Sequence, residues 1–143
     1  MRISQHFTLE ELTASSTAKA KNIMNLPDAQ QMLNLAGLVH NVLEPLRVGM
    51  GIPINISSGY RCTQLNKAVG GVSNSQHCTG EAADISIDGD IKKGANIFNY
   101  IKQHLPFDQL IFEHNASGVY WVHVSYRTDG KNRQQKIENL LKK

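Results

Sequence analysis

Apolar side chains recur at helical spacing in two long segments of the chain. The first segment starts at Pro27-Asp28, and its apolar positions are Met32, Leu35, Leu38, Val39, Val42 and Leu43. This period predicts a helix that opens at Pro27-Asp28 and runs up to Pro45, and Leu46 and Val48 are expected to extend its buried contacts. The second segment, residues 91–104, also has one apolar face and is predicted to form another helix.

Capping and turn signals predict the shorter elements. Thr8 followed by Glu11 has the spacing of a capping box, so a short helix is predicted to begin at Thr8. Another short helix is predicted over 62–69. Apolar runs bounded by turn residues predict four strands, over 54–57, 82–87, 109–113 and 119–126. These elements predict an α+β fold in which a small antiparallel sheet has helices packed on one face.

The length of the chain predicts a single domain. A chain of 143 residues can bury one hydrophobic core but is short for two, so residues 1–143 are expected to fold as one unit. Residues 131–143 are polar and are predicted to form a C-terminal helix or tail. The apolar side chains of this segment form a stripe for docking: Ile137, Leu140 and Leu141.

Charge and hydropathy narrow the classes of function. The formal net charge is +3 and the basic residues are scattered, so there is no continuous basic face and no nucleic-acid partner is expected. No apolar run has the length of a membrane span or of a secretory signal. We therefore expect synthesis in a cytoplasm, no stable membrane insertion and a monomeric protein.

Two imidazoles and one carboxylate stand out as candidate metal ligands. His77 and Asp84 flank Gly80 and two alanines, and small residues let the backbone turn tightly and bring both side chains towards one ion. His123 lies inside the apolar run 119–124. Two histidines and one carboxylate, with a fourth position left for water, are the ligand set of a catalytic zinc site. The competing interpretation is a surface loop and an ordinary strand histidine.

A cation precedes this group in the sequence. The run 54–57 leads through Ser58-Gly59 to Arg61. A guanidinium group has the fork geometry that suits a carboxylate or a polarised carbonyl, so Arg61 is a candidate for substrate binding.

With these residues the chain resembles a known family. The family contains the zinc D-alanyl-D-alanine carboxypeptidases and L-alanyl-D-glutamate endopeptidases, which cut peptidoglycan stem peptides and share a fold with the hedgehog signalling domain. The matching blocks are Ser58-Gly59-Tyr60-Arg61, Ser75-Gln76-His77 through Gly80, Ala82 and Asp84, and Trp121-Val122-His123. The resemblance spans about Pro45 to Tyr126, and the opening block 7–12 is similar to short members found in phages and prophages.

The resemblance implies a cofactor, a substrate and roles for the matching residues. Zn²⁺ is the implied cofactor and a peptidoglycan stem peptide the implied substrate. The implied zinc ligands are His77, Asp84 and His123. The implied substrate-binding residues are Tyr60, Arg61 and Ser75, and Arg61 is also the candidate for stabilising the oxyanion.

The chain departs from the family at the general base. Larger members carry a carboxylate three residues before the last histidine, and this chain has Tyr120 there. The candidates to take the proton from water are Glu113, Glu81 and His114, of which Glu113 is favoured.

Whether Glu113 can reach the metal site depends on the register of the strands. If the strand that ends at Glu113 pairs with the next strand through a turn at 115–118, Glu113 lies opposite Val119 and shares a sheet face with His123. A slip of one residue would move Glu113 to the other face. Glu113 is therefore predicted to be the base if the hairpin has this geometry.

Cys62 and Cys78 are expected to be free thiols. A cytoplasm is reducing, and the two cysteines lack the Cys-x-x-Cys spacing of a structural zinc site. Neither is therefore predicted to bind the metal or to form a disulfide.

These inferences predict a zinc peptidase that acts on cell walls. The short, phage-like chain and the lack of a signal peptide favour a phage or prophage endolysin. Such an enzyme waits in the host cytoplasm and reaches the wall when a separate holin opens the membrane. Two other classes compete with this hypothesis: a non-catalytic wall-binding or virion structural module, which Tyr120 favours, and a regulatory zinc-binding interaction domain. The sequence leaves open which bond is cut and whether cleavage is endo- or exopeptidic.

Overall fold

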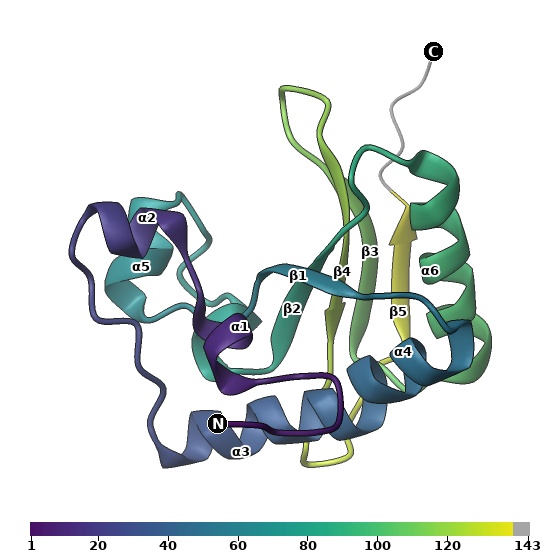
Figure 1. The fold of residues 1–143 in the computed structure, drawn as a ribbon, viewed down its shortest axis with the longest axis horizontal. Coiled ribbons are helices and arrows are strands. Elements are labelled where there is room, and N and C mark those ends of the chain that lie inside the picture. Colours follow the sequence, from purple (N-terminus) through teal and green to yellow (C-terminus); the bar gives the residue numbers. More distant parts are fainter. Residues whose placement is uncertain (139–143) are drawn as a thin grey trace.

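The computed structural model describes residues 1–138, which form one sheet and several helical segments (Figure 1). The helical segments are α1 (Leu9–Thr13), α2 (Ser16–Ala20), α3 (Ala29–Leu38), the π-helical turn η1 (Val39–Leu43), α4 (Glu44–Met50), α5 (Thr63–Ala68), the 3-10 turn η2 (Gln76–Thr79) and α6 (Ile91–His104). The strands are β1 (Asn55–Ser58), β2 (Ala82–Ser86), β3 (Gln109–His114), β4 (Tyr120–Ser125) and β5 (Gln135–Glu138). Within these residues, none of the helices has both the length and the apolar character needed to cross a membrane.

The strands form a five-stranded sheet in the order β1-β2-β4-β3-β5. Neighbouring strands are antiparallel except β3 and β5, which are parallel. The predicted α+β class is confirmed. The small antiparallel sheet gains one parallel edge strand that the sequence pattern did not indicate.

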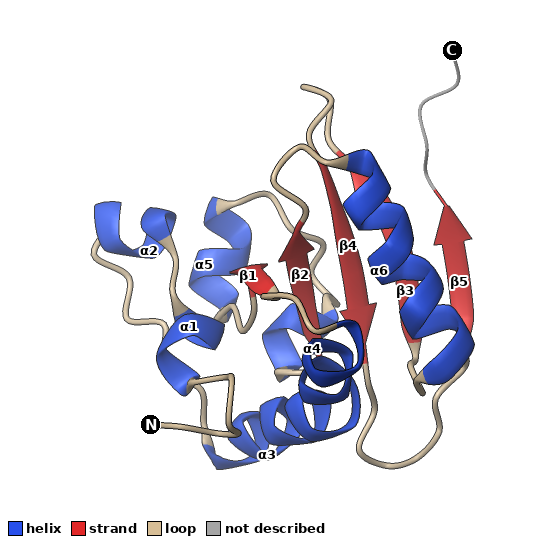
Figure 2. Cartoon of the chain, turned by 45° about the vertical axis from the view of Figure 1, so that its right-hand side comes forward, coloured by secondary structure: helices blue, strands red, loops and turns tan. Residues whose placement is uncertain are grey.

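The two faces of the sheet have different roles, because successive side chains of a strand point to opposite sides. One face packs into the hydrophobic core together with residues of α3, α4 and α6, and α6 lies along this face in Figure 2. The core residues on this face are Ala83, Ile85, Leu110, Phe112, Val122 and Val124. The other face carries Asp84 and His123, which lie directly opposite each other on β2 and β4. Helices therefore pack on the first face, the covered face, and the candidate site lies on the second, the free face.

The helix predicted to end at Pro45 continues past this residue. α3 runs through the π-helical turn η1 into α4, which has Pro45 at its start and ends before Gly51. A proline ring clashes with the preceding turn of a regular α-helix and lacks a backbone N–H. A π-helical turn has a wider hydrogen-bond spacing, and its position just before Pro45 lets the helical path continue.

The β3–β4 hairpin is two residues out of the predicted register. Glu113 lies opposite Trp121, and not opposite Val119. The turn sets this register, because the Asn115 N–H donates to the Val119 carbonyl at 3.0 Å and so places these two residues opposite each other. A shift of two residues keeps every side chain on its face. Glu113 therefore shares the face of His123, as predicted, although its partner was wrong.

The C-terminal segment 131–143, predicted to be a helix or a tail, contains the strand β5. Buried Asp108 fixes the start of this strand: its carboxylate accepts from the Arg133 N–H at 2.9 Å, and its carbonyl accepts from the Gln135 N–H at 3.0 Å. Ile137 lies opposite Ile111 of β3. The other two residues of the predicted docking stripe, Leu140 and Leu141, lie outside the described residues.

Candidate metal centre

A short turn held against α3 positions His77. The Ser75 hydroxyl caps this turn by accepting from the His77 N–H at 3.1 Å. Two side chains of α3 bind carbonyls of the turn: Gln31 donates to Cys78 at 3.1 Å, and Asn34 donates to Thr79 at 2.9 Å. The backbone that carries His77 is therefore attached to the helical layer at several points.

Gly80 ends the turn in a conformation that requires glycine. Its φ is +79°, and a Cβ built on it would lie 2.4 Å from the Gln31 carbonyl oxygen. A residue with a side chain would be strained by the positive φ at this position, and its Cβ would also clash with the backbone of α3. The close approach of the turn to α3 therefore depends on the missing side chain.

We expect Gly80→Ala to be more destabilising than Gly118→Ala. Gly118 has a similar φ of +81° but no atom within 4 Å of a built Cβ, so its variant bears the left-handed cost alone. That cost is about 1–2 kcal/mol. The steric overlap should add about 1–3 kcal/mol at Gly80. Denaturant unfolding of both variants measures the difference, and equal losses would show that the turn moves away from α3 without cost.

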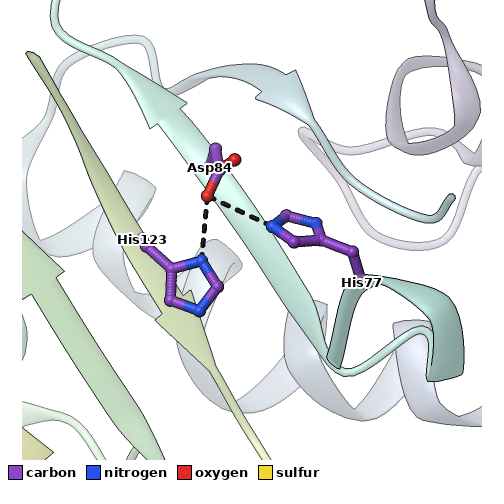
Figure 3. Close-up of side chains that lie close together, drawn as sticks. All are labelled: His77, Asp84 and His123. Atoms are coloured by element: carbon purple, nitrogen blue, oxygen red, sulfur yellow. Dashed lines mark hydrogen bonds and ion pairs between the residues drawn. The ribbon is translucent and has the colours of Figure 1, made fainter. Parts of the chain in front are cut away.

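The three candidate ligands lie together at the centre of the free sheet face. His77 comes from η2, Asp84 from β2 and His123 from β4 (Figure 3). The Asp84 Oδ1 atom is 3.3 Å from His77 Nε2 and 2.9 Å from His123 Nδ1. One ligand atom from each side chain lies within 4.8 Å of the others. The sequence pattern therefore predicted the right three side chains to converge.

A backbone contact fixes the orientation of the His77 ring. His77 Nδ1 lies 2.7 Å from the Gly59 carbonyl oxygen, which can only accept, so Nδ1 carries the proton and donates. Nε2 is the atom that faces Asp84, and in a neutral ring with its proton on Nδ1 it would carry the lone pair that binds a metal ion. Histidine ligands of metal ions commonly donate their second ring nitrogen to a carbonyl in this way.

The charge state of Asp84 also suits a cation. Burial raises the pKa of the Asp84 carboxyl, but the neighbouring His77 and His123 rings outweigh this effect and hold the pKa below its ordinary value. The group is therefore an ionised carboxylate near neutral pH, which is the form that binds metal ions.

The donor set fits Zn²⁺. Imidazole nitrogen and carboxylate oxygen are zinc ligands, and catalytic zinc sites use three protein ligands and keep one position open. Ligand atoms about 2.1 Å from a tetrahedral ion lie about 3.4 Å from each other. The distances from Asp84 Oδ1 to the two ring nitrogens, 3.3 and 2.9 Å, are close to this spacing.

The three side chains open into a cleft of about 770 Å³. It is also lined by four residues that the sequence analysis gave as candidates for substrate binding or for the general base: Arg61, Ser75, Glu81 and Glu113. The backbone N–H of Arg61 donates to the His77 carbonyl at 3.1 Å, which holds the arginine beside the metal-ligand turn. The Ser75 hydroxyl is already used as the cap of that turn. The predicted substrate-binding residues Arg61 and Ser75 thus lie in the cleft wall.

Tyr60 is placed differently from the prediction. Its side chain is only 5% exposed, belongs to the hydrophobic core and does not line the cleft. The backbone explains this placement: the Tyr60 N–H donates to the Leu12 carbonyl at 2.8 Å, so this stretch packs against α1. The structure thus does not bring Tyr60 to the cleft wall, and its predicted contact with substrate stays a prediction.

A family comparison agrees with this geometry. The model of the family described as peptidase M15 matches residues 5–125. The chain belongs to the peptidase M15 family. A search of curated proteins found no match. Membership of M15 implies a metallopeptidase, and the matched range contains all three residues of the His77–Asp84–His123 cluster.

In this M15 peptidase the sheet faces separate the candidate general bases. Tyr120 contacts Phe112, a core residue, and His114 contacts Tyr120, so both lie on the covered side of the sheet. Glu113 and Glu81 line the cleft, and Glu81 accepts from the Thr79 hydroxyl at 2.5 Å. The geometry therefore favours a carboxylate on the free face over His114.

Asn25 supports the M15 site although its sequence context gave no signal. Its side-chain oxygen accepts from the Cys62 N–H at 2.8 Å, and its nitrogen donates to the carbonyls of Thr13 and Tyr60 at 2.9 Å each. One asparagine thus joins the N-terminal helices to the loop that presents Arg61. Only the folded structure shows this, because the contacts join segments far apart in sequence.

Both cysteines are free thiols, as expected. We predict that the double variant Cys62→Ser, Cys78→Ser keeps its zinc content and most of its activity. Burial raises the pKa of the Cys78 thiol and disfavours the thiolate that binds metals. Cys62 caps α5 through its sulfur, and serine is a better cap, so stability should hold. A large fall in zinc content on elemental analysis would contradict this prediction.

Proposed function

We propose that this M15 peptidase binds one Zn²⁺ through His77, Asp84 and His123 and hydrolyses peptide bonds in peptidoglycan stem peptides. The observation that carries the proposal is the convergence of two imidazoles and one ionised carboxylate at the floor of a wide cleft. The substrate class rests on the resemblance of the surrounding sequence blocks to wall-cutting zinc peptidases. The proposal covers both the carboxypeptidase and the endopeptidase type.

Each residue of the cleft has a role in the proposed reaction. Bound zinc would lower the pKa of a water molecule towards neutrality and polarise the scissile carbonyl. Glu113 takes a proton from the attacking water and returns it to the leaving amine. Arg61 donates to the developing oxyanion or holds a carboxylate of the stem peptide. Its Nε is buried and has no hydrogen-bond partner among the described residues.

We also propose a biological setting. The protein is a phage or prophage endolysin that is made in the host cytoplasm and reaches the cell wall after holin-type release. The support for this setting is the similarity of residues 7–12 to short phage members of the family. Release of wall fragments on addition of the purified protein from outside tests the wall as target.

Zymography on purified cell walls tests the proposed function. The wild-type protein should clear the wall material with zinc and lose this activity in a chelator, and added zinc should restore it. A non-catalytic wall-binding module would bind the walls without clearing them under any metal condition. Tyr120 stands where larger members of the family carry a carboxylate and favours that alternative, so clearing of the walls by the wild type would count against it.

A further inference from the structure

Gln76 has an unusual environment beside the metal-ligand turn. It precedes His77 in η2, and its side chain lines the cleft. The Nε2 atom donates to Asp108 Oδ2 at 2.9 Å, whereas the Oε1 atom is buried and has no hydrogen-bond partner among residues 1–138. Buried polar groups are almost always paired, because an unpaired one loses its hydrogen bonds to water without replacement. This acceptor therefore calls for a partner that the folded chain does not supply.

Asp108 dictates the orientation of the Gln76 carboxamide. Arg133 holds the carboxylate of Asp108 through its Nε at 3.0 Å and its Nη2 at 2.8 Å. These hydrogen bonds from Arg133 outweigh burial and lower the pKa of Asp108 to about 2, so the group is ionised. An ionised carboxylate only accepts hydrogen bonds. Gln76 must therefore turn its NH₂ group to Asp108 and its oxygen away from it.

The unpaired groups of the cleft wall are complementary to a peptide. Gln76 Oε1 is an acceptor and Arg61 Nε is a donor, and both are buried, unpaired and part of residues that line the cleft. Both residues adjoin the metal cluster, since Arg61 donates through its backbone to His77 and Gln76 precedes His77. A peptide backbone offers the matching N–H donor and C=O acceptor.

We propose that Gln76 is a specificity-determining residue whose carboxamide oxygen, covered in this structure, is uncovered by a shift of the cleft wall on binding and accepts a hydrogen bond from a backbone N–H of the bound peptide. Asp108 and Arg133 are positioning residues that act through the orientation of Gln76. The inference rests on the proposed function, because a peptide has to occupy the cleft. It adds a rule of recognition: one backbone nitrogen of the substrate must carry a hydrogen.

The test uses a synthetic stem pentapeptide ending in D-Ala-D-Ala, and a set in which one backbone nitrogen at a time carries a methyl group. Calorimetry with the zinc-loaded protein gives the dissociation constants, and mass spectrometry follows cleavage separately. In the wild type, methylation at one nitrogen should weaken binding about three- to tenfold more than at the others, the value of one hydrogen bond. Gln76→Met should weaken binding of the unmodified peptide by that factor and remove the discrimination at that nitrogen.

Two further variants separate recognition from structure. Asp108→Asn offers an NH₂ group to Gln76, which lets the carboxamide turn over, so discrimination should fall although Gln76 is still present. Gln109→Met is the matched control: Gln109 also lines the cleft, but its Nε2 bonds the neutral Gln135 side chain at 2.8 Å, and a pair of neutral amides can turn over together. This control should keep the discrimination. Gln76→Met and Asp108→Asn test the inference independently, so a folding failure of one leaves the other to decide.

The outcomes distinguish this inference from the proposed function. In one outcome the wild type cleaves the peptide, and each methyl group weakens binding equally in the wild type and in Gln76→Met. This result overturns the role of Gln76 and leaves the peptidase proposal intact. Discrimination that depends on Gln76, without any cleavage, supports the role of Gln76 and contradicts hydrolysis. A wild type that neither binds nor cleaves the peptides overturns both.

Discussion

Replacing His77 or His123 by alanine is expected to remove the bound zinc and all measurable wall lysis. The site offers three protein ligands and no fourth histidine, cysteine or carboxylate within its cluster among the described residues. Loss of a group that only supports a ligand typically costs 10–100-fold in metal affinity, so loss of a ligand should cost more than about a hundredfold. Elemental analysis after dialysis gives the zinc content, and turbidity of a wall suspension gives the activity.

His114→Ala is the matched control for the histidine variants. His114 lies on the same hairpin but on the covered face of the sheet, where it contacts Tyr120. This variant should keep its zinc and its lytic activity. Full metal occupancy in His77→Ala or His123→Ala would contradict the assignment of the ligands.

Glu113→Gln is expected to lower turnover about a hundred- to ten-thousandfold while zinc content and fold stay intact, since this is the usual contribution of a general base. Glutamine has the same shape as glutamate but cannot take a proton from water. Glu113 lines the cleft and shares the free sheet face with His123. Single-turnover rates on a labelled stem peptide measure the effect.

Glu81→Gln tests whether Glu81, and not Glu113, is the general base. Glu81 lines the same cleft but accepts a hydrogen bond from the Thr79 hydroxyl, which competes for its carboxylate. We expect a smaller loss of turnover in this variant than in Glu113→Gln. The reverse order would transfer the role of base to Glu81, and near-native turnover in both variants would leave no carboxylate as base.

The elements with strong local signals could be predicted from the sequence. The helix over 91–104 has the predicted bounds, because an apolar face and the Asp90 cap determine it locally. The capping box of Thr8 and Glu11 forms as predicted. The convergence of the metal-ligand candidates followed from the order of the sequence blocks, and η2 and the strands β2 and β4 place them as expected.

Tertiary contacts decided the features that the sequence did not reveal. Tyr60 turns into the core because its backbone binds α1, and the local pattern contains no trace of this contact. β5 has only one apolar side chain, Ile137, and forms because Asp108 holds the chain just before it. The register of the hairpin depends on where its turn begins, and composition alone did not determine that position. The role of Gln76 depends on a carboxylate 32 positions away.

Mass spectrometry of the fragments released from purified cell walls tests the central claim most directly. Wild-type protein freed of metal and then reloaded with zinc should release stem-peptide fragments with new amino and carboxyl termini at one defined bond. The same protein in a chelator, and His123→Ala with zinc, should release none. Binding of the wild type to the walls without any new terminus, at every zinc concentration, would contradict the account and would identify the chain as a non-catalytic wall-binding module.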